Sequence, residues 1–149
     1  MSKKELVTFT NMCMITDGGR VLVQNRTDPG WPGIAFPGGH VEEGESFTAS
    51  VIREVYEETG LTIEAPRLCG VKDWYDENGR YVVLLYRADR FSGTLRASEE
   101  GEVFWAALDE LPGMNLASNL DDTLKVYLND DLSECQYYLE DGAWRTAIR

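Results

Sequence analysis

Three glutamates at helical spacing are the residues of this chain best suited to chemistry. Glu54, Glu57 and Glu58 stand at i, i+3 and i+4, so on one helix face Glu54 would repel each of the other two by roughly 0.2–0.5 kcal/mol. A divalent cation would relieve this repulsion, because Mg²⁺ takes carboxylate oxygens and completes its shell with water and substrate phosphates. The spacing favours a metal-dependent reaction on a phosphorylated compound, with a solvated acidic face as the alternative.

The residues around these glutamates predict the helix that carries them. Ser46 is a favourable N-cap, and Gly60 stands where a helix ends in the left-handed conformation. The helix is therefore expected to run from Phe47 to Thr59. Its opposite face gathers apolar side chains that can pack on a core, namely Val51, Ile52, Val55 and Tyr56.

Two features beside the helix favour a binding site over a solvated face. Pro37-Gly38-Gly39 supplies flexible backbone that can bring a carbonyl or an amide into the site. Glu45 and Arg53 bracket the start of the helix with opposite charges that can hold the preceding loop in place.

The stretch from Gly39 to Leu61 resembles the signature of the Nudix hydrolase family, and in particular of its MutT-like subgroup (8-oxo-dGTP diphosphatase type). That signature has a glycine, five residues, a Glu, seven residues, and then Arg-Glu-aliphatic-x-Glu-Glu-x-Gly-aliphatic. The specified positions are filled by Gly39, Glu45, Arg53, Glu54, Val55, Glu57, Glu58, Gly60 and Leu61. The resemblance implies an α/β/α sandwich with a central mixed β-sheet.

The resemblance also implies hydrolysis of a nucleoside diphosphate linked to another group, with Mg²⁺ as cofactor and Mn²⁺ as a substitute. Glu57 and Glu58 would be the main metal ligands, and the Gly38 carbonyl a further ligand. Glu54 would be a ligand or the base that takes the proton of water. The Glu45–Arg53 pair would belong to the catalytic motif by fixing the loop on the helix.

Further candidates lie outside the signature. Many family members draw a carboxylate from a distant loop, and Glu100 is placed to provide it, although a plain surface acid is an equal alternative. His40 can contact phosphate or line the loop, and Trp31 can cover its loop or stack on a base. The predicted substrate-binding residues are Arg26, Phe36, Gly39, His40, Asn119 and Asp122, with Trp105 and Asp121 as further candidates for base recognition.

Three functions remain open at this point. The first is a MutT-like pyrophosphohydrolase that converts a nucleoside triphosphate, such as 8-oxo-dGTP, to a monophosphate and pyrophosphate. The second is a hydrolase of a nucleotide-sugar, ADP-ribose or a dinucleoside polyphosphate. The third is a non-catalytic ligand-binding protein, which the intact Glu54, Glu57 and Glu58 disfavour.

Composition limits the partners. With 14 basic and 26 acidic residues, the net charge of −12 argues against binding to a nucleic acid polymer or an anionic membrane. The N-terminus lacks an apolar signal core, and no run approaches the roughly 18 apolar residues of a membrane span. The three cysteines form no CxxC pair and are expected as buried thiols in a reducing cytoplasm. A monomer or homodimer that binds a small nucleotide is expected.

The remaining pattern predicts a single domain over residues 1–149. A loop is expected at Asn25–Ile34, and the first two strands are expected to form a hairpin. Strands are predicted at Leu6–Ile15, Arg20–Gln24, Leu68–Tyr75, Tyr81–Ala88 and Glu102–Ala106, a helical turn at Asp109–Leu111, a second amphipathic helix at Asn119–Leu128, and a final hairpin of Gln136–Leu139 and Ala143–Ile148.

Overall fold

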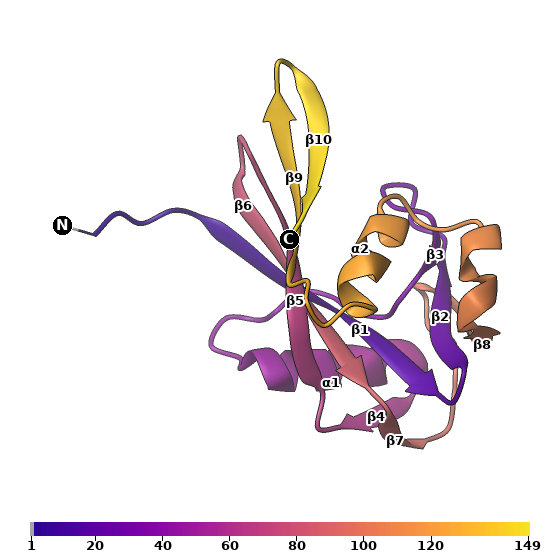
Figure 1. The fold of residues 1–149 in the computed structure, drawn as a ribbon. Coiled ribbons are helices and arrows are strands. Elements are labelled where there is room, and N and C mark those ends of the chain that lie inside the picture. The colour runs from indigo at the N-terminus through magenta and orange to yellow at the C-terminus, as the bar shows by residue number, and fades with distance from the viewer. Residues whose placement is uncertain (1) are drawn as a thin grey trace.

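A computed structural model describes residues 2–149 and shows a mixed β-sheet with helices on both faces (Figure 1). The predicted α/β class is confirmed. The elements in chain order are β1 Val7–Asp17, β2 Arg20–Arg26, β3 Gly33–Ala35, α1 Phe47–Thr59, β4 Leu61–Glu64, β5 Arg67–Asp76, β6 Gly79–Ala88, β7 Arg90–Gly93, β8 Gly101–Ala107, a 3₁₀ helix Leu108–Gly113, α2 Leu120–Tyr127, β9 Glu134–Glu140 and β10 Ala143–Ile148.

The main sheet has the strand order β10-β9-β5-β6-β1-β2-β3, and β8 pairs with the outer side of β2. Its centre is the parallel pair β1 and β6, which runs from Val7 opposite Arg80 to Ile15 opposite Ala88. The predicted hairpin of β1 and β2 is present but short, since only Thr16 and Asp17 pair with β2. The rest of β1 is therefore free to pair with another segment on that side.

Helix α1 has the bounds that its capping residues predicted. The Ser46 side chain accepts a hydrogen bond from the Ala49 backbone N–H, and Gly60 ends the helix at φ 80° while its N–H donates to the Tyr56 carbonyl. Val51 and Val55 are fully buried against the sheet. The apolar face is thus used for packing except at Tyr56, which was predicted to pack on the core but is 50% exposed. The glutamates remain on the other side.

Strand β1 is buried on both faces, which explains the two cores of the molecule. Met12 and Met14 pack on the side of α2, while Cys13 and Ile15 pack on the side of α1. This division follows from the alternation of side chains along a strand. Because both faces are covered, β1 is a rigid base for whatever pairs with its free edge.

Three short segments differ from the prediction. The expected loop at Asn25–Ile34 is wrong at both ends, because β2 continues to Arg26 and β3 begins at Gly33 and pairs with it. Strands β4 and β7 form a separate two-stranded sheet, and neither strand was predicted. Strands of three or four residues carry too little pattern to be recognised, and their pairing partners decide their conformation.

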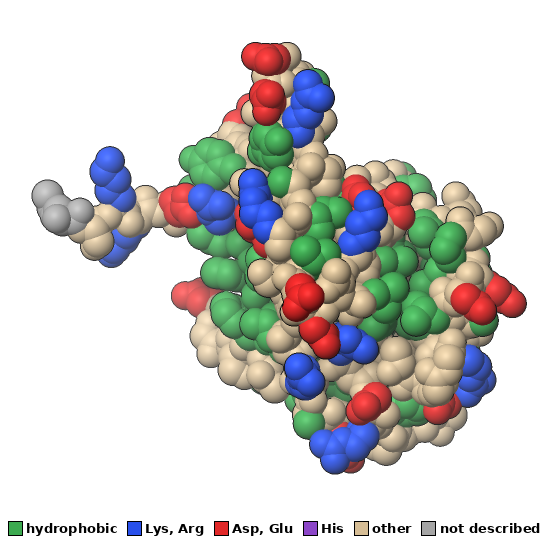
Figure 2. Space-filling view, viewed as in Figure 1, with side chains coloured by type: hydrophobic (Ala, Val, Ile, Leu, Met, Phe, Trp, Pro, Cys, Tyr) green, Lys and Arg blue, Asp and Glu red, His purple; other side chains and the backbone are tan. Residues whose placement is uncertain are grey.

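The predicted C-terminal hairpin is present at the edge of the sheet. Asp141 and Gly142 have φ values of 51° and 77°, as a type I′ turn requires. Strand β9 pairs in parallel with β5, so the hairpin continues the main sheet and extends beyond the body of the molecule (Figure 1). Charged side chains gather at its tip (Figure 2).

The cysteine expectation is correct for two residues. Cys13 and Cys135 are buried, whereas Cys69 is half-buried near the start of β5, and all three are free thiols. Within residues 2–149, no helix has the length and apolar character needed to cross a membrane.

Replacing Gly60 by Ala tests the end of α1. The new Cβ would meet the Thr94 carbonyl oxygen at a residue with φ +80°, whereas Gly44, at φ +76°, has open space around it. We expect Gly44→Ala to cost about 1 kcal/mol from backbone strain and Gly60→Ala about 3 kcal/mol from strain and overlap together. Urea unfolding measures both, and equal losses would show that the contact with Thr94 is unimportant.

Candidate active site

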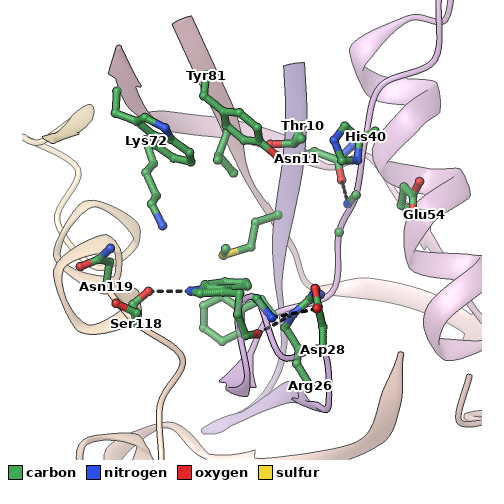
Figure 3. A pocket seen from close by; sticks show the side chains of 18 of the residues that line it. Thr10, Asn11, Arg26, Asp28, His40, Glu54, Lys72, Tyr81, Ser118 and Asn119 are labelled. Atoms are coloured by element: carbon green, nitrogen blue, oxygen red, sulfur yellow. Dashed lines mark hydrogen bonds and ion pairs between the residues drawn. The ribbon is translucent and has the colours of Figure 1, made fainter. Parts of the chain in front are cut away.

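A cavity of about 1110 Å³ opens on the α2 side of the sheet and reaches the acidic face of α1 (Figure 3). One part of its wall is acidic and glycine-rich, and it contains Gly38, Gly39, Glu54, Glu58 and Glu100. The other part lies over β5, β6 and the C-terminal hairpin, and it is formed mainly by Lys72, Trp74, Tyr81, Tyr137 and Trp144. The cavity therefore joins an acidic region to an aromatic one.

The glycine turn runs along the free edge of β1. The Cys13 N–H donates to the Pro37 carbonyl at 2.9 Å, and the Asn11 N–H donates to the Gly39 carbonyl at 2.8 Å. Gly38, between them, must direct its N–H and carbonyl away from β1, because polar groups alternate along an extended chain. Its N–H donates to Glu58 Oε2 at 3.0 Å, so its carbonyl faces the same side.

Close packing requires glycine at both positions of this turn. A Cβ on Gly38 would meet the Asn11 carbonyl, and a Cβ on Gly39 would meet the carboxylate of Glu54. Asn11 also joins the turn to the helix, because its Oδ1 accepts from the Gly39 N–H at 3.2 Å and its Nδ2 donates to Ser50 Oγ at 3.0 Å. This role of Asn11 was not predicted from the sequence.

The Arg53 guanidinium fastens the loop before α1 to the helix. Its Nε donates to Glu45 Oε2 at 2.7 Å and its Nη2 to Glu45 Oε1 at 2.9 Å, which is a bidentate pair. Nη2 also donates to the His40 carbonyl at 3.0 Å. Hydrogen bonds from Arg53 lower the pKa of Glu45 to about 2. The Glu45–Arg53 pair is formed as predicted, and its catalytic importance stays a prediction.

Glu58 is the most deeply buried carboxylate of the acidic face, with 5% of its surface exposed. Burial raises its pKa to about 8; the Gly38 hydrogen bond acts in the opposite direction, and the charges of Glu54 and Glu100 add to the increase. Burial also raises the pKa of Glu54, against the hydrogen bond and charge of Arg53. The fold thus holds these carboxylates close together although burial and mutual repulsion disfavour their charged forms, and a bound cation would offset both effects.

Glu57 has a different position from the other two glutamates. Its side chain is exposed, does not line the cavity, and accepts from Arg53 Nη1 at 3.2 Å. Within residues 2–149, no three Asp, Glu, His or Cys side chains are arranged as a ready-made metal site. A role for Glu57 as ligand would require it to leave Arg53.

The donor chemistry of the acidic region nevertheless fits Mg²⁺. Glu54, Glu58 and Glu100 all line the cavity, and the Gly38 carbonyl accepts no hydrogen bond from the described residues. These are the hard oxygen ligands that Mg²⁺ prefers, and the buried like charges favour a divalent cation electrostatically.

The predicted substrate-binding residues divide into two groups. Arg26, Gly39, His40 and Asn119 line the cavity. Arg26 is directed by a hydrogen bond from its Nε to the Trp31 carbonyl at 3.1 Å and by a 3.5 Å contact with Asp28. Glu100, predicted from a distant loop, also reaches the cavity, in agreement with its effect on the pKa of Glu58.

The other predicted residues are placed less favourably for base recognition. Phe36 lines the cavity, but it is 1% exposed and its ring packs edge-on against Tyr127. Asp122 lies outside the cavity wall and pairs with Lys125 at 3.5 Å. Trp105 packs with Phe91 on the α1 side of the sheet. Burial and strand face, which the local pattern did not reveal, explain these positions, and the roles of Phe36 and Asp122 in substrate binding stay predictions.

The aromatic region was missed almost entirely. Lys72 and Trp74 lie on β5, Tyr81 on β6, and Tyr137 and Trp144 on the final hairpin. A weak signal existed, because Lys72 and Trp74 are two residues apart and must share a strand face. Only the order of the strands brings them beside Asn119 and Trp31.

Comparison with known proteins gives consistent results. The family model described as "NUDIX domain" matches residues 7–127. The "Uncharacterized Nudix hydrolase YvcI" of Bacillus subtilis is 33% identical over 111 residues, which are 70% of this chain and 69% of the relative. An "ADP-ribose pyrophosphatase" of Methanocaldococcus jannaschii is 31% identical over 115 residues, 75% and 67% of the two chains. The crystal structure of a mutator MutT protein from Bacillus halodurans superimposes with a TM-score of 0.77 at 26% identity, over 93% of this chain and 97% of that one.

Gly39→Ala tests how the turn positions Glu54. The added methyl would displace the end of a flexible side chain, so we expect stability to change little. Turnover should fall about tenfold or more, because misplacement of a reacting group by about 1 Å can cost 10²-fold. Gly113→Ala is the matched control, since a Cβ there meets no atom within 4 Å. A displaced Glu54 with unchanged kcat would contradict this role of the turn.

Glu58→Gln tests how much the buried carboxylate of Glu58 lowers the stability of the folded protein. The folded pKa near 8 lies above the ordinary value of 4.5, so the folded protein holds a proton that the unfolded chain has lost, and stability falls as pH rises through this window. Chelator-treated Glu58→Gln should be more stable than wild type by about 1–3 kcal/mol at pH 8 and should show less difference at pH 5. Urea unfolding at both pH values measures this, and added Mg²⁺ should stabilise only the wild type.

Proposed function

The chain belongs to the Nudix hydrolase family, and on this basis we propose that it is a Mg²⁺-dependent, MutT-like pyrophosphohydrolase of nucleoside triphosphates. The products would be a nucleoside monophosphate and pyrophosphate, with 8-oxo-dGTP among the substrates to be tested. The principal supporting observation is the buried carboxylate of Glu58 against the Gly38 amide, at the acidic end of a cavity with aromatic walls. Membership in a family of hydrolases favours an enzyme over a non-catalytic binding protein.

Each residue of the acidic region has a proposed role. Glu58, Glu54, Glu100 and the Gly38 carbonyl would hold Mg²⁺, with Glu57 joining them after leaving Arg53. When bound, Mg²⁺ polarises phosphoryl oxygens and makes water a better nucleophile. Because this chain carries a charge of −12, a cation is also needed to offset its repulsion of a polyphosphate.

Glu54 is the proposed base. A bond forms between the water oxygen and phosphorus, the bond from that phosphorus to the bridging oxygen breaks, and Glu54 takes the proton of the water. Arg53 holds the Glu54 carboxylate through its Nη1 at 2.9 Å while its other nitrogens hold Glu45. Arg53 and Glu45 therefore act as positioning residues that keep the loop, the helix and the base in register.

The proposed nucleotide would lie along the cavity with its phosphates at the acidic end. Arg26 and His40 line that part of the wall and could contact phosphate oxygens. The base would enter the aromatic region near Asn119. The family match ends at residue 127, but β9 continues the same sheet through β5, which supports the proposal of one domain.

A second candidate is a nucleoside diphosphate sugar such as ADP-ribose. Two observations favour it: the relative from Methanocaldococcus jannaschii is named an ADP-ribose pyrophosphatase, and a cavity of about 1110 Å³ exceeds the usual range of small-molecule sites. A panel of nucleoside triphosphates and nucleotide sugars, assayed for pyrophosphate and monophosphate release, distinguishes the two candidates.

Glutamine substitutions test the catalytic assignment. We expect Glu57→Gln and Glu58→Gln to lower kcat by about two orders of magnitude, the scale of one lost electrostatic contact in a buried site, and removal of Mg²⁺ by a chelator to abolish activity. Glu99→Gln is the matched control, because Glu99 is an exposed acid next to Glu100 and does not line the cavity. Equal turnover in the three variants and the wild type would rule out the proposed site.

A further inference from the structure

Lys72 is a nearly buried lysine without a polar partner. It lies on β5 with 6% of its surface exposed and lines the cavity. Its Nζ is 5.3 Å from the ring centroid of Trp31, 5.7 Å from that of Trp74 and 5.5 Å from that of Tyr137. Figure 3 shows the side chain extending into the cavity toward Asn119. Among residues 2–149, no acceptor lies within hydrogen-bond or ion-pair distance of Nζ.

The aromatic surroundings satisfy only part of what an ammonium group needs. Ring faces attract its charge, but an ammonium also carries three N–H donors. Nζ is not among the fully buried side-chain atoms that lack a partner, so these donors are open to the cavity. Burial lowers the pKa of Lys72, while the charges of Cys135 and Asp122 act in the opposite direction. A chain that keeps such a group at a cavity wall has donors available to a ligand.

The sheet register places Lys72 away from the acidic end. Across the sheet, His40 bridges to Thr10, Thr10 is opposite Val83, and Val83 is opposite Lys72. Three strand spacings therefore separate the glycine turn from Lys72, which is about 14 Å. In a nucleotide whose phosphates occupy the acidic end, the group at this distance is the base.

The surroundings of Lys72 suit a planar ring. Trp31 is held by a hydrogen bond from its Nε1 to the Ser118 carbonyl at 2.8 Å, and Trp74 stacks on Tyr81 with centroids 4.4 Å apart. Fixed aromatic rings provide faces for a base without selecting which base. Asn119 also lines this region, but an amide offers both a donor and an acceptor. Lys72, which can only donate, is the selective group.

We propose that Lys72 is a specificity-determining residue that selects nucleobases presenting a carbonyl oxygen over those presenting an amino group. Guanine offers the adjacent acceptors O6 and N7, and uracil or thymine offers O4, whereas adenine and cytosine place an amino donor at the same position. If the Lys72 ammonium faced the amino group of a base, neither group could accept a hydrogen bond from the other, and the N–H donors of both would stay unpaired. This inference rests on the proposed hydrolysis of nucleotides.

Binding of nucleoside monophosphates tests the selection directly, because it needs no hydrolysis. We would measure GMP, UMP, AMP and CMP by titration calorimetry, and kcat/KM for the corresponding triphosphates with Mg²⁺. The wild type should prefer GMP to AMP by about tenfold or more. Lys72→Met should lower GMP affinity by a similar factor and change AMP affinity by less than about twofold.

The controls separate specificity from folding and from phosphate binding. Methionine keeps the apolar stem of lysine and removes a poorly partnered buried charge, so Lys72→Met should remain folded in thermal melting. Lys125→Met makes the same chemical change at an exposed residue of α2 and should alter neither preference nor affinity. If Lys72→Met fails to fold, a wild type that lacks a preference for carbonyl bases still overturns the inference.

Several results would overturn the inference. A wild type that binds AMP or CMP more tightly than GMP and UMP contradicts it. Equal losses for all four nucleotides in Lys72→Met would show that Lys72 contacts a part common to all of them, such as phosphate. In contrast, a Lys72-dependent preference for GMP without hydrolysis of any triphosphate would support the inference and contradict the proposed function.

Discussion

The arrangement of the candidate active site depends on how the glycine turn pairs with β1. Hydrogen bonds from Cys13 to Pro37 and from Asn11 to Gly39 leave the polar groups of Gly38 facing α1, where Glu58 accepts its N–H. A side chain at either glycine would displace the β1 backbone contact or the Glu54 carboxylate. Backbone contacts therefore fix the distance between the central strand and the acidic helix, and this distance does not depend on the rotamer of a side chain.

The pairing of the glycine turn with β1 brings several carboxylates close together, and their mutual repulsion destabilises the folded protein at this place. Glu58 is buried near other acids and has a raised pKa, while Arg53 is engaged with Glu45 and the carbonyl of His40. Arg53 thus stabilises the loop and only partly neutralises the acidic face. The remaining negative charge is suited to a divalent cation, because a cation would offset the repulsion between these carboxylates.

The two ends of the cavity differ in both origin and character. The acidic end comes from α1 and the glycine turn, which together carry the family signature. The aromatic end comes from β5, β6 and a hairpin beyond the region matched by the family model. Lys72 belongs to this second end, where it is a side chain that can only donate hydrogen bonds. Such a division allows substrate preference to vary while the hydrolytic end is kept.

Local interactions allowed the sequence alone to determine the bounds of α1 and the acidic character of one of its faces. Its N-cap at Ser46, its end at Gly60 and the i, i+3, i+4 spacing of its glutamates all depend on residues within a few positions of one another. The C-terminal turn was predictable for the same reason. Only the tertiary structure decided that Phe36 is buried and that Lys72 stands among three aromatic rings. These outcomes depend on strand order and register between segments far apart in the chain, which no local pattern records.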